Sequence, residues 1–531
     1  MHLKGHAMMN WSKQTSSQRI RSFKASAPAT AINLRTFDQP FLAARQASIQ
    51  QRMKVDGKRE PLIFDVPRNA AILVDGVHVY IQMLDFAEVM MERERETEAS
   101  HRRVLSMLHL NYAACDQVAE EYEAQRVDFH GSRMHAVIIS PPGPENAQER
   151  AERALAFADA VKRAIEEVGR TTENGRYSTR VRVGVDSGPA VAVNSGTRDE
   201  REPLFLGAPA NYAAKLAEGD QEGIFLSNKV RRDLDMQPLF GLDELYTERS
   251  NPAQTTGIGG LSGRAAFQTM RMSDAAVLNA ASRARSRFIL DVGTDASFSF
   301  HRHTPPLKTI DFTLLMPSNS IRMGLMSIFG DIDGFTKYVD ECIAGGRIRE
   351  MVANLHVIRS ELAATLSEDF LGRKVRFIGD CIHGLVAAGT AHETNASDSV
   401  VAAVKAAGGM RSSFELCQTE LDGIEALGIA IGLEFGETPV TRIGIRGDRS
   451  VRCSVSRAVS TSEELQKRCD GDQTALGPQA LQHAPAGIRR LFDSGVAWGL
   501  DAESVGEHLS APATISSGAI SATAAPYCRE S

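Results

Sequence analysis

The 531-residue sequence has little of several features that would define its class. Aromatic residues make up 6% of the chain, and its seven cysteines are scattered without a C-x-x-C pair. This pattern argues against a disulfide framework and against a zinc site. No apolar run approaches the roughly 20 residues that span a bilayer, and the first 15 residues lack the apolar centre of a signal peptide. We therefore expect a cytoplasmic protein that has no membrane-spanning segment.

A strong charge of one sign is also missing. The 66 acidic and 60 basic residues give a net charge of −6, so the overall charge gives no reason to expect a nucleic-acid partner. Residues 1–60 are a local exception, with eleven basic and three acidic residues and no sustained apolar period. This composition predicts a basic flexible arm.

Two stretches of the chain, 61–235 and 321–500, show the same order of expected elements. In each, a strand is followed by helix, a hairpin, a long helix, two short strands and a further helix. The first-copy elements are expected over 70–80, 83–124, 127–140, 145–168, 180–186, 190–194 and 208–218.

Corresponding positions in the two stretches lie at similar separations. Gly379 follows Gly131 by 248 residues and Ser460 follows Asn211 by 249, whereas Asp331 follows Asp75 by 256. A nearly constant separation indicates that the same domain occurs twice. Residues 236–320 would form a linker with some structure of its own, and 501–531 a low-complexity tail.

The second copy places two aspartates where carboxylates can converge. Phe329-Gly-Asp-Ile-Asp-Gly-Phe-Thr336 puts Asp331 where a strand ends before a helix, and Phe377-Ile-Gly-Asp380 puts the other in a tight hairpin. Two converging carboxylates supply the hard oxygen ligands that Mg²⁺ on a nucleoside triphosphate needs. A single aspartate in such a context more often only caps a turn.

These two segments resemble the metal-binding motifs of the class III nucleotidyl (adenylate and guanylate) cyclases. In the first copy, Arg182–Pro189 and Phe205–Leu216 extend the resemblance, the latter to the family's Gly-x-x-x-Asn-x-Ala-x-Arg helix, so that it covers about 350 residues. It implies an α+β fold in which two ferredoxin-like cyclase domains form an intramolecular pseudo-heterodimer. It also implies a nucleoside triphosphate substrate and two Mg²⁺ or Mn²⁺ ions as cofactors.

On this resemblance the second copy supplies the metal site. Asp331 and Asp380 take the two metal-binding positions, and the carbonyl of Ile332 is a further ligand. Phe335 and Thr336 begin a helix whose backbone N–H groups would face phosphates, because helix N-termini favour anions.

The first copy supplies the residues opposite the metals. Asn211 takes the position of the asparagine that orients the ribose, and Lys215 that of the arginine that stabilises the α-phosphate in the transition state. The two are four residues apart and therefore share a helix face. Lysine keeps the charge of arginine but loses its bidentate fork.

Each copy lacks what the other keeps. In the first, the alignment gives Asp75 and Ser132 at the metal positions, so a full metal site is missing. In the second, Ser460 and Glu464 stand at the asparagine and arginine positions. We therefore predict one composite catalytic site between the copies and a second, degenerate pocket.

The base-reading positions fall on Asp128 and Leu204, where adenylate cyclases carry lysine and aspartate. A carboxylate at Asp128 accepts hydrogen bonds from N–H groups of guanine, uracil or cytosine, and apolar Leu204 is compatible with a pyrimidine. The chain is thus similar to the bacterial pyrimidine cyclases of the Pycsar anti-phage systems, which make cyclic UMP or cyclic CMP. UTP or CTP is the favoured substrate.

Other functions remain open from the sequence, among them binding of a nucleic acid or a membrane surface through the basic residues 1–60. Another is a guanylate cyclase, because that subfamily also carries a carboxylate at the position of Asp128. A third is a catalytically degenerate nucleotide-binding scaffold. The domains could pair within one chain or between two, and further dimerisation is compatible with either arrangement.

Overall fold

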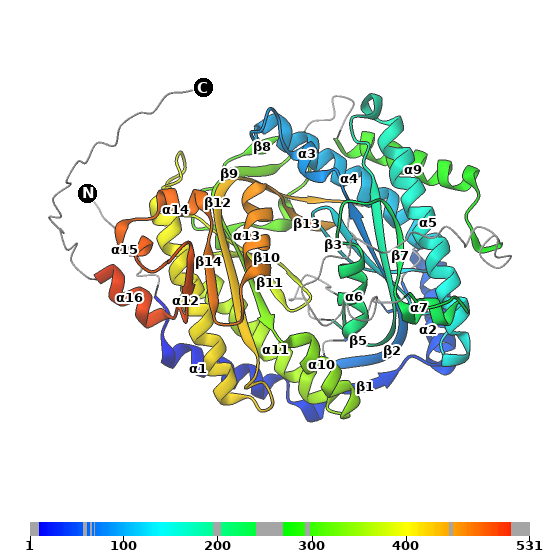
Figure 1. Cartoon of the computed structure of the whole chain (residues 1–531), viewed down its shortest axis with the longest axis horizontal. Helices are drawn as coiled ribbons and strands as arrows, with labels where there is room; N and C mark the ends of the chain where they lie inside the picture. The colour runs from blue at the N-terminus through cyan, green and yellow to red at the C-terminus, as the bar shows by residue number, and fades with distance from the viewer. Residues whose placement is uncertain are drawn as a thin grey trace, which may run out of the picture.

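The computed structural model describes residues 10–56, 61–63, 66–67, 69–194, 203–239, 269–292, 298–444 and 450–510. Two mixed sheets lie side by side, and each has long helices on its outer face (Figure 1). The α+β fold with two cyclase-type domains in one chain is therefore confirmed. Within these residues, no helix combines the length and the apolarity that a membrane crossing requires.

The sheet of the first domain has the strand order β3-β4-β2-β5-β6, with β7 beside β5 and β1 beside β2. Its elements follow the predicted order closely, but the two strands expected over 180–186 and 190–194 form one continuous strand, β5. The bounds are β2 (Ala70–Met83), α3 (Phe86–Met90), α4 (Glu98–Glu121), β3 (Gln125–His130), β4 (Arg133–Ile138), α5 (Ala147–Thr171), β5 (Val181–Asn194), β6 (Pro203–Leu206), α6 (Ala208–Leu216), β7 (Gly223–Leu226) and α7 (Asn228–Asp233).

The second sheet has the order β10-β11-β9-β12-β14-β15, with β13 beside β12 and β8 beside β9. It repeats the topology of the first sheet and adds β15 at one edge. The bounds are β8 (Phe300–His301), β9 (Ser320–Asp333), α10 (Phe335–Ala344), α11 (Ile348–Ala364), β10 (Arg373–Ile378), β11 (Cys381–Val386), α12 (Ala396–Glu420), β12 (Gly428–Ile443), β13 (Val451–Ser454), α13 (Arg457–Arg468), β14 (Gln473–Leu476), α14 (Pro478–His483), α15 (Ala486–Arg489) and β15 (Val496–Trp498).

One glycine in each sheet fixes the equivalence of the two domains. Gly184 in β5 lies under α6, and Gly432 in β12 lies under α13; a Cβ at either position would collide with the backbone of that helix. Gly184 pairs with Tyr80, and Gly432 pairs with Phe329. Tyr80 and Phe329 are therefore equivalent, at a separation of 249 residues.

The two domains share their hydrophobic cores. Ile443, Cys453 and Val455 of the second domain are buried in the cluster that α4 and α5 form with the first sheet. Reciprocally, Val191 and Leu204 of the first domain are buried in the cluster around α11 and α12. Burial of apolar area across this boundary makes the domain pair one packed body.

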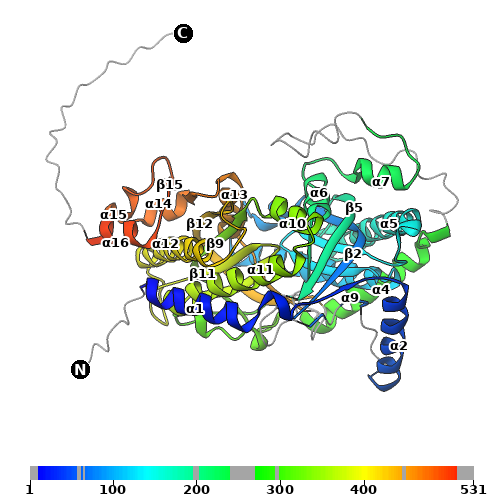
Figure 2. The same ribbon diagram turned by 90° about the horizontal axis from the view of Figure 1, so that it is seen from below.

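The expectation of a flexible arm over 1–60 is wrong for the residues that the structure describes. Residues 10–56 form α1 (Lys13–Ser26), β1 (Asn33–Thr36) and α2 (Gln39–Asp56). Figure 2 shows α1 running beneath the second domain and α2 extending below the first. The basic residues are used in ion pairs: the Arg19 guanidinium lies 2.7 Å from Glu361 and 2.8 Å from Asp369. Composition alone does not reveal such tertiary partners.

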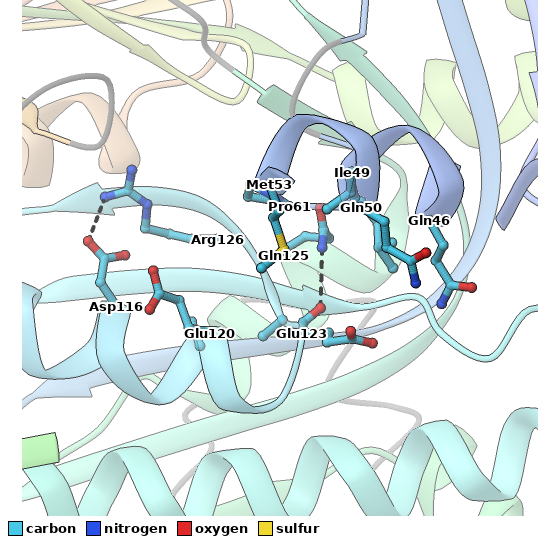
Figure 3. Close-up of a pocket in the computed structure, with 13 residues that line it drawn as sticks. Gln46, Ile49, Gln50, Met53, Pro61, Asp116, Glu120, Glu123, Gln125 and Arg126 are labelled. Atoms are coloured by element: carbon cyan, nitrogen blue, oxygen red, sulfur yellow. Dashed lines mark hydrogen bonds and ion pairs between the residues drawn. The ribbon is translucent and has the colours of Figure 1, made fainter. Parts of the chain in front are cut away.

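Helix α2 also borders a cavity of about 370 Å³ against α4 and β3 (Figure 3). Arg126 and Asp116 form an ion pair at its edge, with 3.4 Å between nitrogen and oxygen. The amide of Gln125 donates to the carbonyl of Glu123 and also accepts from the N–H of Ile63. The segment before the first domain is thus tied to strand β3.

Parts of the predicted linker and tail are ordered as well. Helix α9 (Asp274–Val292) packs on α4 and α5, where Phe288 is 1% exposed and joins the core of the first domain. Helix α16 (Ala502–Ser510) packs on α12. The rest of the predicted linker, 240–268 and 293–297, and of the tail, 511–531, lies outside the described residues.

Candidate active site

The two aspartates predicted to bind metal lie at adjacent ends of neighbouring strands. Asp331 stands near the end of β9, and Asp380 occupies the turn between β10 and β11. Gly379 has a φ of 63°, which allows the tight two-residue turn. Because Ile382 pairs with Gly330, this turn brings Asp380 beside the end of β9.

Both carboxylates are electrostatically strained. Desolvation and the neighbouring charge of Asp333 raise the pKa of Asp331 to about 6. Desolvation and the charge of Asp331 raise the pKa of Asp380 well above its usual value. A bound cation would relieve this repulsion, so the pair fits a hard divalent metal.

The protein supplies few other ligands of this kind. Among the described residues, no group of three or more histidine, cysteine, aspartate or glutamate side chains is arranged to hold a metal. Further ligands would therefore be main-chain oxygens, such as that of Ile332, or oxygens of the substrate. A site with open positions of this kind is what a metal bridging to phosphates requires.

The N-terminus of α10 follows directly after Asp331. Its N-cap, Gly334, has a φ of 78° and makes no side-chain capping bond, so the first N–H groups of the helix have no side-chain cap. The side chain of Phe335 is buried in the core and that of Thr336 is half-buried. These two residues therefore offer backbone donors and one hydroxyl to an anion.

Helix α6 of the first domain lies against α10 of the second, near the centre of the molecule (Figure 1). The amide of Asn211 donates to the hydroxyl of Thr336, and the N–H of Ala208 donates to Asp340 at 3.1 Å. Asp340 thus caps α6 from the other domain. These two contacts join α6, which carries the exposed Asn211 and Lys215, to α10 of the other domain.

Lys215 lies one helical turn after Asn211 on the same face of α6. Within the described part of the chain its ammonium group has no carboxylate within ion-pair distance. The charge is therefore available to a phosphate. The structure brings Asn211 to Thr336, 125 residues away in sequence, and sets Asp331 beside Asp380.

The predicted base-reading residues lie on two strands that contact each other, β3 and β6. Leu204 is 8% exposed and packs in the interdomain core. The carboxylate of Asp128 accepts a hydrogen bond from Arg376 of β10, which also donates to the carbonyl of Phe129. Sequence reasoning missed Arg376, although it lies 248 residues after Asp128, at the equivalent position.

At the degenerate site, the prediction of Asp75 at the first metal position is wrong. Because Tyr80 is equivalent to Phe329, the residue equivalent to Asp331 is Gln82 and not Asp75, which lies seven residues earlier, inside β2. Gln82 donates to the hydroxyl of Ser132 at 2.6 Å. The discordant separation of 256 residues was the signal for this correction.

A cluster of charges from both domains lies at the degenerate site and extends toward the metal-binding side, because the charge of Glu463 also raises the pKa of Asp331. Glu463 of α13 lies 2.6 Å from Arg133 and 3.0 Å from His130. Arg133 also donates to Gln82 at 2.8 Å. Burial by itself would raise the pKa of Glu463, but His130 and Arg133 hold it well below its usual value. The exposed Glu464 and the half-buried Ser460 lie on α13 at the expected positions.

Comparisons with known proteins agree with this architecture. A model of the adenylate and guanylate cyclase catalytic domain matches residues 78–253. A uridylate cyclase of a Rhizobium species is 76% identical over 98% of this chain and 99% of its own length. A uridylate cyclase of Pseudomonas aeruginosa is 37% identical over 84% of this chain and 85% of its own length.

One solved structure matches nearly the whole fold. It is described as a class III adenylyl cyclase-like ATP-binding protein from Pseudomonas aeruginosa and is 32% identical to this chain. The match covers 95% of this chain and 100% of that one, with a TM-score of 0.78.

Proposed function

The chain belongs to the class III nucleotidyl cyclases, and we propose that it converts UTP to 3′,5′-cyclic UMP and pyrophosphate. The observation that carries this proposal is the composite cleft: Asp331 and Asp380 come from one domain, and Asn211 and Lys215 from the other. The two relatives named uridylate cyclase support uracil as the base.

The catalytic residues divide the work between the domains. Asp331 and Asp380 would hold two Mg²⁺ or Mn²⁺ ions, which when bound lower the pKa of the ribose 3′-hydroxyl and offset the charge of the triphosphate. Asn211 holds the ribose so that the 3′-oxygen lies in line with the α-phosphorus. Lys215 stabilises the negative charge that grows on the phosphoryl oxygens.

The N-terminus of α10 fixes the triphosphate. Its backbone N–H groups at Phe335 and Thr336 would bind phosphate oxygens, as helix N-termini favour anions. The bond between Thr336 and Asn211 links the phosphate-binding side to the ribose-binding side. Alignment of the two reacting atoms thus depends on contact between the domains.

Asp128 reads the base in this proposal. Its carboxylate accepts from the N3–H of uracil while Arg376 holds it in place; a carboxylate has about four lone-pair sites, so both bonds are compatible. Leu204 would pack against the apolar edge of the ring. We further propose that the product is a second messenger in antiviral defence, on the resemblance to the Pycsar cyclases.

The test is a parallel assay of purified protein with each of the four nucleoside triphosphates and Mn²⁺ or Mg²⁺. Cyclic UMP should be the main product. Cyclic GMP or cyclic CMP as the main product would overturn the base assignment, and no cyclic product from any substrate would overturn the enzymatic function. Asp128→Ala should reduce the preference for UTP over the other three more than it reduces total turnover.

The antiviral role has its own test. Bacteria that express the chain should give fewer phage plaques than bacteria that express the Asp331→Asn variant. Equal plaque counts with both proteins, at equal expression, would overturn this part of the proposal.

A further inference from the structure

A second cavity lies in the first domain, outside the residues of the composite cleft. It has a volume of about 230 Å³ and lies between β2, β5, the start of α5 and helix α7. Its lining is mostly charged and small. Its polar lining residues are Asp75, Arg150, Ser187, Lys229, Arg232 and Asp233.

The equivalent place in the second domain is filled. Ser187 corresponds to Phe435, because each lies three residues after the glycine that fixes the alignment. The Phe435 ring packs against His483 of α14, with 5.1 Å between ring centroids, whereas Ser187 donates to Asp233 of α7 at 2.6 Å. The second domain thus places an aromatic ring where the first domain has a charged cavity.

The wall opposite α7 differs in the same way. Asp75 corresponds to Gly324, where a Cβ would lie only 3.1 Å from the Phe435 ring. In the first domain Asp75 pairs with Arg150, whose guanidinium also donates to the carbonyls of Pro141 and Gly143. At equivalent positions, the first domain therefore has the buried, hydrogen-bonded Arg150, and the second domain has the ring of Phe435.

A carboxylate behind the cavity is poorly supplied with hydrogen-bond donors. Asp186 precedes Ser187 in β5, and its side chain is fully buried; within the described ranges neither of its oxygens makes a hydrogen bond of good geometry, although the Ser227 hydroxyl and the backbone N–H of Ser187 lie close enough to lower its pKa. Lys229, which lines the cavity, is 3.8 Å away. The equivalent Glu434 instead accepts from the N–H groups of Phe435, Gln479 and Ala480. Burial of an unsatisfied carboxylate is costly, and burial raises the pKa of Asp186 to about 6.

The charges of the cavity are of both signs and are separated in space. Arg232 is exposed at the rim and has no ion-pair partner among the described residues, and Lys229 has only the distant Asp186. On the other side, Arg150 bonds to one carboxylate oxygen of Asp75 and Ser187 to one of Asp233, so the second oxygen of each can accept from a ligand. A ligand with one anionic group and one ammonium group would neutralise the basic side and the acidic side of the cavity together.

We propose that this cavity binds a small zwitterion of the size of an amino acid, with its anionic group at Lys229 and Arg232 and its ammonium group at Asp75 and Asp233. Its volume is below the roughly 300–1,000 Å³ of pockets that hold drug-sized ligands, which excludes a nucleotide. A bare metal ion is disfavoured, because cationic side chains share the space.

The cavity is connected to the catalytic helix. The Lys229 ammonium lies over the ring of Tyr212, 5.1 Å from its centroid, and Tyr212 is next to Asn211 in α6. A ligand that draws Lys229 into the cavity weakens this contact and changes the position of α6. The second part of the proposal, which rests on the proposed function, is that the ligand alters the rate of cyclisation.

Calorimetry of the full chain tests binding without any use of the enzymatic activity. The probes are the twenty standard L-amino acids and phosphoethanolamine, each compared with its singly charged analogue, an amide or an N-acetyl derivative. At least one zwitterion should bind with one-to-one stoichiometry, and its singly charged analogue should bind about tenfold more weakly or worse, which corresponds to one lost charged contact. No saturable binding, or equal binding of the analogue, overturns the proposal.

Two variants locate the site. Ser187→Phe introduces the plug of the second domain and should abolish binding, and Arg232→Gln should weaken it about tenfold, while Arg490→Gln, an exposed arginine elsewhere, should leave it unchanged. Binding retained by both cavity variants overturns the assignment. Because Arg232 is exposed, its replacement does not endanger folding.

The effect on catalysis is read separately. Saturating ligand should change the rate of cyclic UMP formation by the wild-type protein at least about twofold, consistent with a modest coupling energy. The same ligand should not change the rate of the Ser187→Phe variant. Ligand binding without any change in rate overturns the effect on cyclisation but not the binding site. A protein without cyclase activity overturns the proposed function, and calorimetry still decides whether the cavity binds the ligand.

Discussion

The two clefts between the domains have the same backbone and opposite electrostatics. At the proposed composite site Asp331 and Asp380 repel each other, and the ammonium of Lys215 is not neutralised by a described carboxylate. In the degenerate cleft the equivalent residues, Gln82 and Ser132, bond to each other. In the proposed division, a ligand would satisfy the charges of the first site, whereas the second satisfies its polar groups internally.

The difference shows how a duplicated domain divides stability from catalysis. The charges of Glu463, Arg133 and His130 join the domains at the degenerate cleft. These charges can stabilise the domain pair, whereas the unfavourable charges of Asp331 and Asp380 would be relieved by the proposed substrate and its metals. Four predictions test this division.

The largest effect should come from the metal-binding side. Asp331→Asn should lower cyclic UMP formation by about 10³-fold or more, because a neutral amide no longer holds the cation that offsets the triphosphate charge. The matched variant Gln82→Ala at the equivalent position should change the rate by less than about threefold, as expected for a site without chemistry. Equal losses in the two variants would contradict the division.

Lys215 should have the next largest effect. Lys215→Ala should lower kcat by about 10²–10³-fold, the usual loss for one preorganised charge, and Lys215→Arg should retain activity. The equivalent variant Glu464→Ala should have little effect on rate. Unchanged kcat in Lys215→Ala would show that another cation contacts the α-phosphate.

Glu463→Gln should weaken the domain pair rather than the chemistry. Loss of the charged partner of Arg133 and His130 should lower the free energy of unfolding by about 1–3 kcal/mol, discounted for a side chain that is 18% exposed. Urea denaturation measures this value, with Glu464→Gln, at 64% exposure, as the control. A stable variant with no cyclase activity would place Glu463 in the chemistry instead.

The smallest effect should be a dependence of stability on pH. The pKa of Glu463 is lower in the folded protein than the ordinary value of about 4.3, so the folded state binds fewer protons than the unfolded state. The stabilisation is present above about pH 4.3 and is lost as the pH falls through the folded-state pKa. Below about pH 4.3, Glu463→Gln should reduce the slope of the free energy of unfolding against pH by the contribution of one carboxylate. An unchanged slope would contradict the lowered pKa of Glu463.

Sequence patterns predict most elements because strands and long helices have local apolar periods. Helix α5, for example, is predicted over 145–168 and spans Ala147–Thr171. Helices α1 and α2 escape such prediction because tertiary contacts stabilise them: α1 is tied down by ion pairs such as Arg19–Glu361, and α2 packs against the first domain. The sequence misplaces Asp75 because an aspartate before a glycine looks like the motif, whereas only strand register shows that it lies seven residues too early.

The repeat, the motif with Asp331 and the helix with Asn211 and Lys215 can all be read from the amino-acid sequence, since each depends on residues close together in the chain. Which of these groups meet is a property of the folded domain pair. Asn211 reaches Thr336 over 125 residues, and Arg376 reaches Asp128 over 248, because two sheets with equivalent edges pack against each other. Such contacts depend on how whole domains bury their surfaces, and no local pattern encodes that arrangement.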